Sequence, residues 1–123
     1  MKETIAIIGG GPAGMEAALS LAGRGYKVYL VEKTDALGGH LARWDRLFPQ
    51  QDPAQDLLNE MIGKVREADD YIEVIYGAEL QYVKRRMRGL EVMLSNQTVL
   101  QADAVLVACG FDLFRAERKE EYG

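Results

Sequence analysis

Residues 5–14 read IAIIGGGPAG, and this stretch decides the fold. Its first four residues are apolar, a run typical of a short strand that is buried on both faces of a parallel sheet. Three glycines follow at once, and Pro12 then stands where a helix would begin, a position that suits proline. The stretch therefore predicts a strand, a tight turn and the start of a helix.

The next residues complete a strand–helix–strand unit. Small and apolar residues recur at helical spacing after Pro12, and Gly25 supplies a stop for the helix. Residues 27–31 form a second apolar run, with Glu32 at its end. Two strands joined by a helix within about thirty residues predict a βαβ unit.

A second helix and a third strand extend this pattern. After a loop over residues 33–51, Asp52 and Pro53 mark the start of a helix, and residues 71–76 read as a third parallel strand. We expect one face of the helix to be apolar and buried. That face comprises Ala54, Leu57, Leu58, Met61, Ile62, Val65 and Ala68.

The pattern changes after the third strand. Apolar residues now alternate with polar ones, as in half-exposed antiparallel strands. The alternating residues are Leu80, Tyr82, Leu90, Val92 and Leu94, and residues 104–108 then return to an apolar run. The expected fold class is α/β: a Rossmann-like parallel sheet in the order βαβαβ, with an antiparallel β excursion before a last, buried strand.

The glycines fit the pattern G-x-G-x-x-G of dinucleotide-binding turns, and each has a physical role. Gly9 permits the tight turn out of the strand, Gly11 lets the backbone approach a pyrophosphate, and Gly14 lets the helix pack on the sheet. The free N–H groups and the dipole of the helix start attract phosphates. The alternative is a glycine turn without a ligand, which the matching strand and helix context disfavours.

Glu32 stands roughly 20 residues beyond the last glycine, where the pattern places a carboxylate. Its oxygens can accept hydrogen bonds from ribose hydroxyls, and its charge would repel the 2′-phosphate of an NADP-type ligand. The alternative is a solvated strand end. The pair Gly38-Gly39 and the antiparallel excursion favour FAD over NAD as the dinucleotide.

Composition excludes several other classes of protein. The net charge of -4 and the hydrophobic share of 48% are those of an ordinary globular protein rather than a nucleic-acid-binding one. The basic run from Lys84 to Arg88 precedes Gly89, which predicts the solvated tip of a hairpin. The single cysteine, Cys109, allows neither a disulfide within the chain nor an iron–sulfur cluster held by this chain alone.

Location and extent are also predicted. No apolar run approaches the length that spans a bilayer, and no signal-peptide pattern precedes the first strand. We therefore expect a cytoplasmic protein without direct membrane insertion. Residues 115–122 are highly charged and lead into no further element, which predicts that residues 1–123 form one FAD-binding domain of a longer chain.

Several stretches resemble one group of flavoproteins. They are residues 9–14, 31–33, 38–42 (GGHLA), 48–49 and 107–112, and the ending RKEEYG at 118–123. Together they resemble the A-type subunit of heterodisulfide reductase and its relative, the A-type subunit of the quinone-interacting membrane-bound oxidoreductase complex. The resemblance covers essentially the whole chain and implies an FAD-binding fold, with electrons passing among flavin, iron–sulfur clusters and partner subunits.

The resemblance also implies the residues of the site. The diphosphate would be held by Gly9, Gly11, Pro12, Ala13 and Gly14, and the adenosine ribose would be flanked by Glu32 and Lys33. The path toward the flavin would be lined by Gly39, His40 and Leu41. The backbone of Leu80 would face the adenine, and Ala108 and Gly110 would close over the middle of the cofactor. No catalytic residue and no metal site are predicted.

One departure bears on the function. Relatives of heterodisulfide reductase commonly carry cysteines soon after the Phe-Pro pair, whereas residues 50–53 read QQDP, which favours the quinone-interacting branch. We expect an FAD-binding domain of a flavin-dependent oxidoreductase subunit that passes electrons between protein partners, inactive when isolated. The alternative is a nucleotide module that binds NAD or ADP without activity of its own. Self-association is a further expectation, because an uncovered sheet edge tends to find a partner.

Overall fold

The computed structural model describes residues 3–38 and 53–108. In this part of the chain, helices and strands follow one another in the order expected from the sequence. They are β1 (Thr4–Ile8), α1 (Pro12–Gly23), β2 (Lys27–Glu32), α3 (Pro53–Glu67), β3 (Ile72–Tyr76), β4 (Leu80–Arg85), β5 (Leu90–Leu94), β6 (Val99–Ala102) and β7 (Ala104–Val107).

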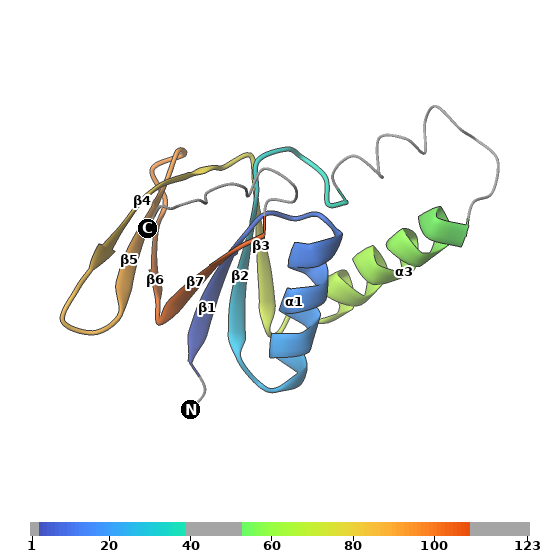
Figure 1. Cartoon of the computed structure of the whole chain (residues 1–123), viewed down its shortest axis with the longest axis horizontal. Helices are drawn as coiled ribbons and strands as arrows, with labels where there is room; N and C mark the ends of the chain where they lie inside the picture. The colour runs from blue at the N-terminus through green and yellow to red at the C-terminus, as the bar shows by residue number, and fades with distance from the viewer. Residues whose placement is uncertain (1–2, 39–52, 109–123) are drawn as a thin grey trace, which may run out of the picture.

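The strands form two sheets (Figure 1). A parallel sheet has the strand order β3-β2-β1-β7, and an antiparallel sheet has the order β4-β5-β6. In the parallel sheet, Ile7 of β1 lies between Leu30 of β2 and Leu106 of β7. The expected α/β, Rossmann-like class with an antiparallel excursion is therefore confirmed.

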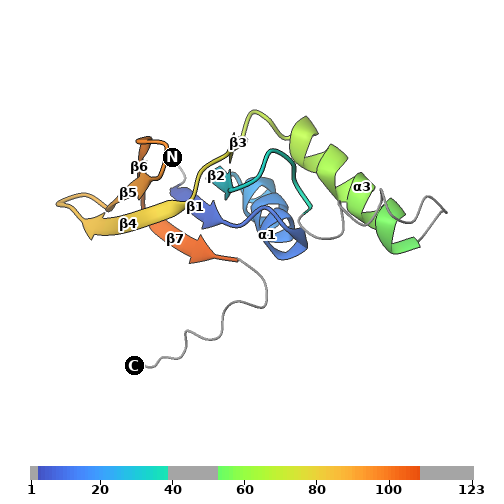
Figure 2. The same cartoon turned by 90° about the horizontal axis from the view of Figure 1, so that it is seen from above.

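β1 is covered on both faces because it lies between two hydrophobic clusters. Ile5 and Ile7 pack with buried residues of α1 and α3. Ala6 and Ile8 point to the opposite face and pack with residues of the antiparallel sheet. Figure 2 shows the antiparallel sheet at one end of the molecule and α3 at the other. A strand covered on both faces needs the continuous apolar run that β1 has.

α3 packs through a narrower face than its sequence predicts. Leu58 and Val65 are 3% and 1% exposed and belong to the cluster that contains α1 residues. Leu57 is 62% exposed, so its assignment to the buried face is wrong. Adjacent helical residues differ by about 100° around the axis, so Leu57 and Leu58 cannot share one packing contact.

A β-bulge in β4 changes which of its side chains face inward. Leu80 pairs with the buried Leu94, whereas Tyr82 pairs with Met93, and the register shifts between Leu80 and Tyr82. The shift places Tyr82 on the face opposite to Leu80, so grouping the two by alternate spacing is wrong. The Tyr82 ring is instead met by the Lys84 ammonium, 5.1 Å from its centroid.

β7 is less buried than its sequence predicts. It is apolar throughout, yet Leu106 and Val107 are 42% and 46% exposed. The cause is its position in the sheet, because β7 pairs with β1 and has no strand on its other side within the described residues. The last strand thus lies in the expected parallel sheet, but it is not buried as expected.

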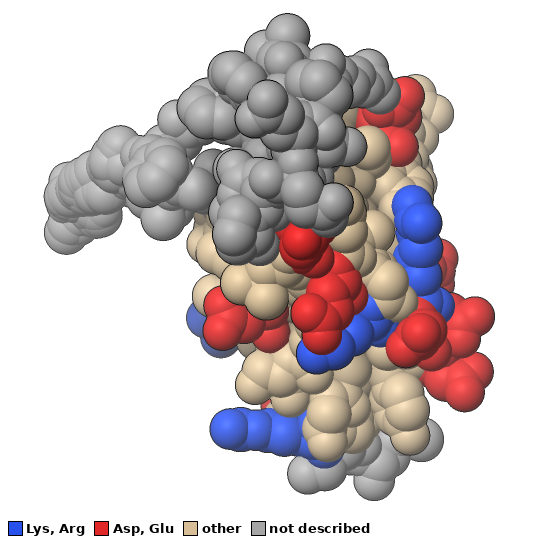
Figure 3. Space-filling view, turned by 90° about the vertical axis from the view of Figure 1, so that its right-hand side faces the viewer, with Lys and Arg blue, Asp and Glu red and all other residues tan. Residues whose placement is uncertain are grey.

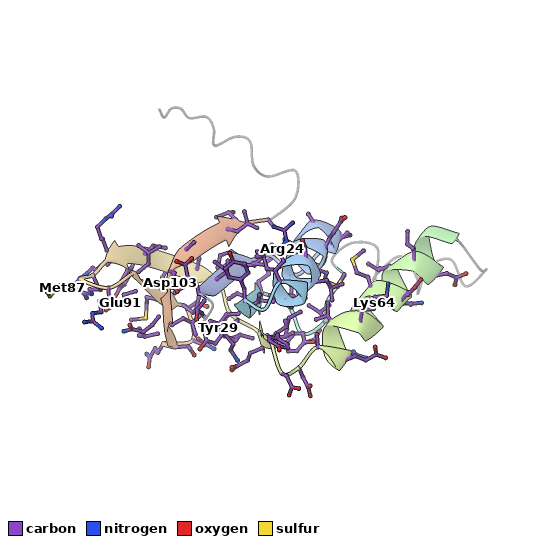
Figure 4. The ribbon with its side chains drawn as sticks, turned by 90° about the horizontal axis from the view of Figure 1, so that it is seen from below. Arg24, Tyr29, Lys64, Met87, Glu91 and Asp103 are labelled. Atoms are coloured by element: carbon purple, nitrogen blue, oxygen red, sulfur yellow. The ribbon has the colours of Figure 1, made fainter. Side chains whose placement is uncertain are left out.

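The basic run lies on an exposed hairpin between β4 and β5, as predicted. Met87 is fully exposed at the hairpin tip, far from Lys64 of α3 (Figure 4). Nη2 of Arg86 lies 2.8 Å from Oε1 of Glu91, which forms an ion pair along the hairpin. Elsewhere, on the face drawn in Figure 3, acidic and basic side chains are intermixed. No helix in the described part of the chain is long and apolar enough to cross a membrane.

Candidate functional site

The residues singled out by the sequence meet at the carboxyl end of the parallel sheet, at the top of Figure 1. There β1 runs into residues 9–11 and α1, and β2 ends at Glu32. Ala108 follows β7 and donates its amide hydrogen to the Ile8 carbonyl oxygen at 2.7 Å. In open α/β sheets this edge is where ligands bind.

Gly9 and Gly14 are required by the protein itself. Gly9 has a φ of 118°, a conformation that favours glycine. Its amide donates to the Val31 carbonyl oxygen at 2.8 Å, so the turn is fixed to β2. A Cβ on Gly14 would collide with the carbonyl oxygen of Gly9. These contacts hold the start of α1 against the end of β1.

Gly11 has no such constraint from the protein. Its φ of -79° is open to any residue. A Cβ built on Gly11 would meet nothing within 4 Å. Open space beside a glycine backbone is what a closely approaching ligand requires. The turn therefore presents a space that a methyl group would fill, next to the first turn of α1.

The N-terminus of α1 has the properties of an anion site. Gly11 is the N-cap and makes no side-chain capping bond, and the first turn holds no acidic residue. Pro12 and Ala13, which follow it, are exposed. The first N–H groups of a helix lack partners within the helix, and its dipole is positive at this end. The uncapped start of α1 is therefore available to a phosphate.

Glu32 is buried, and its carboxylate connects the segments of the site. The residue is 5% exposed, so it is not a solvated strand end. Oε1 accepts a hydrogen bond from the Gly10 amide at 2.9 Å. Oε2 accepts two from Thr34, one from the amide at 2.8 Å and one from the hydroxyl at 2.6 Å. These donors compensate the carboxylate for its removal from water.

The glycine pattern misses two residues of this arrangement. A Cβ on Gly10 would lie 2.7 Å from Oε1 of Glu32 and 2.9 Å from Cδ2 of Leu37, so Gly10 must also be glycine. The run of three glycines is the sequence signal for this position. Thr34, the second residue, has a weaker signal: it is a hydroxyl residue in the turn that follows the acidic strand end.

The other predicted site residues lie in different places. Lys33 is exposed next to Glu32. Leu80 is half-buried at the start of β4, in the antiparallel sheet. Ala78, just before it, donates its amide hydrogen to the Glu32 carbonyl oxygen at 3.3 Å. The described residues contain no group of three or more His, Cys, Asp or Glu that could hold a metal ion. Outside the described residues lie Gly39, His40, Leu41, Cys109 and Gly110.

Comparison with known proteins identifies the cofactor. Residues 4–44, which include the glycine turn and Glu32, match the model of a family described as FAD dependent oxidoreductase. The chain is 36% identical over 110 residues to an A-type iron-sulfur subunit of the CoB–CoM heterodisulfide reductase of Methanopyrus kandleri, a match that covers 89% of this chain and 16% of that one. The chain contains an FAD-binding domain related to the A-type subunits of heterodisulfide reductases.

Further comparisons agree with this FAD-binding domain. The corresponding iron-sulfur subunit from Methanocaldococcus jannaschii is also 36% identical over 110 residues, covering 89% of this chain and 17% of the relative. The chain therefore corresponds to a small part of these curated relatives. In fold, it resembles a ferredoxin reductase from Rhodopseudomonas palustris, with a TM-score of 0.64 and 24% identity over 89% of this chain and 24% of that one.

The flavoprotein disulfide reductase RclA from Escherichia coli has the same fold. Its TM-score is 0.63, with 23% identity over 88% of this chain and 22% of that one. These likenesses confirm the expected fold class, and together with the family match they confirm FAD as the cofactor. They leave the division between the heterodisulfide reductase and quinone-interacting branches as a prediction.

Proposed function

We propose that the chain holds FAD at its glycine turn, within an oxidoreductase subunit that passes electrons between protein partners. The observation that carries the proposal is the open backbone at Gly11, which caps a helix N-terminus without a side-chain bond. A diphosphate needs both a close backbone approach and unpaired N–H groups. The geometry of the turn therefore fits the diphosphate of FAD.

Each site residue has one role in this proposal. The start of α1 holds the diphosphate through Gly9, Gly11, Pro12, Ala13 and Gly14. Glu32 accepts a hydrogen bond from the adenosine ribose, and Lys33 lies beside it. The remaining roles are a path toward the flavin at Gly39, His40 and Leu41, an adenine contact at the backbone of Leu80, and closure over the middle of the cofactor by Ala108 and Gly110.

The chemistry divides between cofactor and protein. FAD, when bound, supplies the electron-accepting and electron-donating ring. The chain's own residues bind and orient the cofactor: the turn neutralises the diphosphate, and Glu32 fixes the ribose end. We assign a catalytic role to no side chain of this site.

The relatives indicate which partners to propose. One is an iron–sulfur subunit, and another, from Methanothermobacter marburgensis, is one subunit of an H2:CoB–CoM heterodisulfide,ferredoxin reductase. We propose other subunits of an electron-transfer complex as partners, with any membrane association made through them. The sequence QQDP at residues 50–53 favours a quinone-linked complex over an iron–sulfur one. We also propose self-association through the open side of β7.

The alternative is a module that holds only the nucleotide part of the cofactor. The two proposals differ in what happens to the flavin ring, so its redox midpoint potential separates them. If the protein contacts the ring, the potential of FAD on the purified protein should differ from that of free FAD by about 30 mV or more, which for two electrons is about 1.4 kcal/mol. An unchanged potential would support the nucleotide module instead.

A further inference from the structure

The carboxylate of Glu32 has three protein donors, and two of them belong to Thr34. The amide and hydroxyl of Thr34 reach Oε2 at 2.8 and 2.6 Å, and the Gly10 amide reaches Oε1 at 2.9 Å. A carboxylate offers about four acceptor positions. With respect to the described donors, the position that remains is therefore on Oε1.

Thr34 is itself held by its neighbours. Its carbonyl oxygen accepts the Gly77 amide hydrogen at 3.0 Å, which attaches the turn after β2 to the end of β3. Its hydroxyl lies 2.6 Å from Glu32 and 3.0 Å from the Ala36 carbonyl oxygen. A hydroxyl has one hydrogen, and the shorter, charge-assisted contact with the carboxylate takes it. Thr34 is thus a fixed donor to Glu32.

The surroundings of Glu32 restrict any other orientation of its carboxylate. A Cβ on Gly10 would be only 2.7 Å from Oε1, so the glycine backbone packs directly against the carboxylate. The Gly38 amide donates to the Gly10 carbonyl oxygen at 2.9 Å, and Leu37 is 3% exposed beneath the turn. The glycine turn and the turn after β2 therefore enclose the carboxylate together.

We propose that Thr34 is a positioning residue for the adenosine ribose, because its hydroxyl fixes Oε2 and leaves Oε1 of Glu32 to accept one ribose hydroxyl. The inference rests on the proposed FAD site and adds a residue to it that touches no ligand. An acceptor that is already oriented avoids the cost of ordering it on binding. Removing the Thr34 hydroxyl should therefore weaken recognition of the ribose in particular.

The test compares ADP with its two deoxy analogues by calorimetry on the purified protein. The wild type should bind either 2′-deoxy-ADP or 3′-deoxy-ADP at least about tenfold more weakly than ADP, because one hydrogen bond to a charged group is lost. Thr34→Val, which keeps the shape of the side chain, should reduce this discrimination to less than about threefold. Thr34→Ser, which keeps the hydroxyl, should retain it.

Controls separate positioning from folding. Thr98→Val makes the same chemical change in the turn between β5 and β6, where the backbone of Thr98 bonds with Leu94 and Asn96, and should leave the discrimination unchanged. Thr34→Ala replaces Thr34→Val if the latter does not fold by urea denaturation.

Two outcomes would overturn the inference. One is full discrimination in Thr34→Val, even if all its affinities fall together, since Thr34 would then act on folding alone. The other is a wild type that binds ADP and both analogues equally. A wild type that binds neither ADP nor FAD would instead contradict the proposed function itself.

Discussion

Gly9, Gly11 and Gly14 belong to one sequence pattern, yet different forces act on each. Gly9 answers to backbone conformation, with its φ of 118°, and Gly14 to a collision with the Gly9 carbonyl oxygen. At Gly11 the structure shows ordinary dihedrals and empty surroundings. Selection for glycine at this position therefore points to the ligand rather than to the fold.

This difference predicts the behaviour of Gly11→Ala. Its stability to urea should match the wild type within about 0.5 kcal/mol, as for a surface change without new contacts. Its affinity for FAD, measured by fluorescence titration, should fall at least about tenfold, or about 1.4 kcal/mol, because the methyl group occupies the space of the diphosphate.

Gly23→Ala is the matched control for this prediction. Gly23 lies at the other end of α1, and a Cβ there also meets nothing within 4 Å. This variant should bind FAD like the wild type and should be as stable or slightly more so, since alanine favours helix. Equal FAD affinity in Gly11→Ala and wild type would contradict the placement of the diphosphate.

At this scale the sequence predicts the residues with a local signature. The glycine pattern and the acidic end of the second strand could be found because their roles follow from spacing alone. The role of Gly10 could not, since its amide meets a carboxylate 22 positions away along the chain. Nor could that of Thr34, because nothing in the pattern shows that the turn folds back onto the strand end.

Among the elements, α3 shows most clearly what periodicity leaves open. Its pattern correctly predicts a helix, but it groups Leu57 with Leu58. Leu58 is 3% exposed and Leu57 is 62% exposed, because the position of α1 decides how wide the buried face is. The bulge in β4 has the same effect on Tyr82. By contrast, β1 and β2 were predictable because sheet strands covered on both faces need unbroken apolar runs.

The contrast between neighbours in α3 gives an element-scale prediction. Leu58→Ala should lower the free energy of unfolding by about 2 to 5 kcal/mol, because a buried side chain is lost and a cavity is left. Leu57→Ala should change it by less than about 0.5 kcal/mol. Urea denaturation measures both, and similar losses for the two variants would show that α3 packs through a different face.

For the whole molecule, the open side of β7 is the feature that its own sequence does not explain. Ala104–Val107 is an apolar run suited to the inside of a sheet, yet two of its side chains are more than 40% exposed, at 42% and 46%. An uncovered strand edge presents unpaired N–H and C=O groups to other chains. This feature underlies the proposed self-association.

The proposal predicts concentration-dependent association of the purified protein. Light scattering should show particles larger than a monomer, and Leu106→Lys should shift them toward the monomer, because a charged side chain disfavours strand pairing. Met87→Lys, at the fully exposed tip of the β4–β5 hairpin, is the control and should leave association unchanged. A wild type that stays monomeric at every concentration would exclude self-association.

The central claim is that this chain binds FAD at the carboxyl end of its parallel sheet. The most direct test is the visible absorption spectrum of the purified protein, followed by identification of the nucleotide that heating releases. We predict a flavin spectrum, present on purification or after adding FAD, and FAD as the released nucleotide. A colourless protein that takes up no added FAD but binds NAD or ADP would contradict the claim.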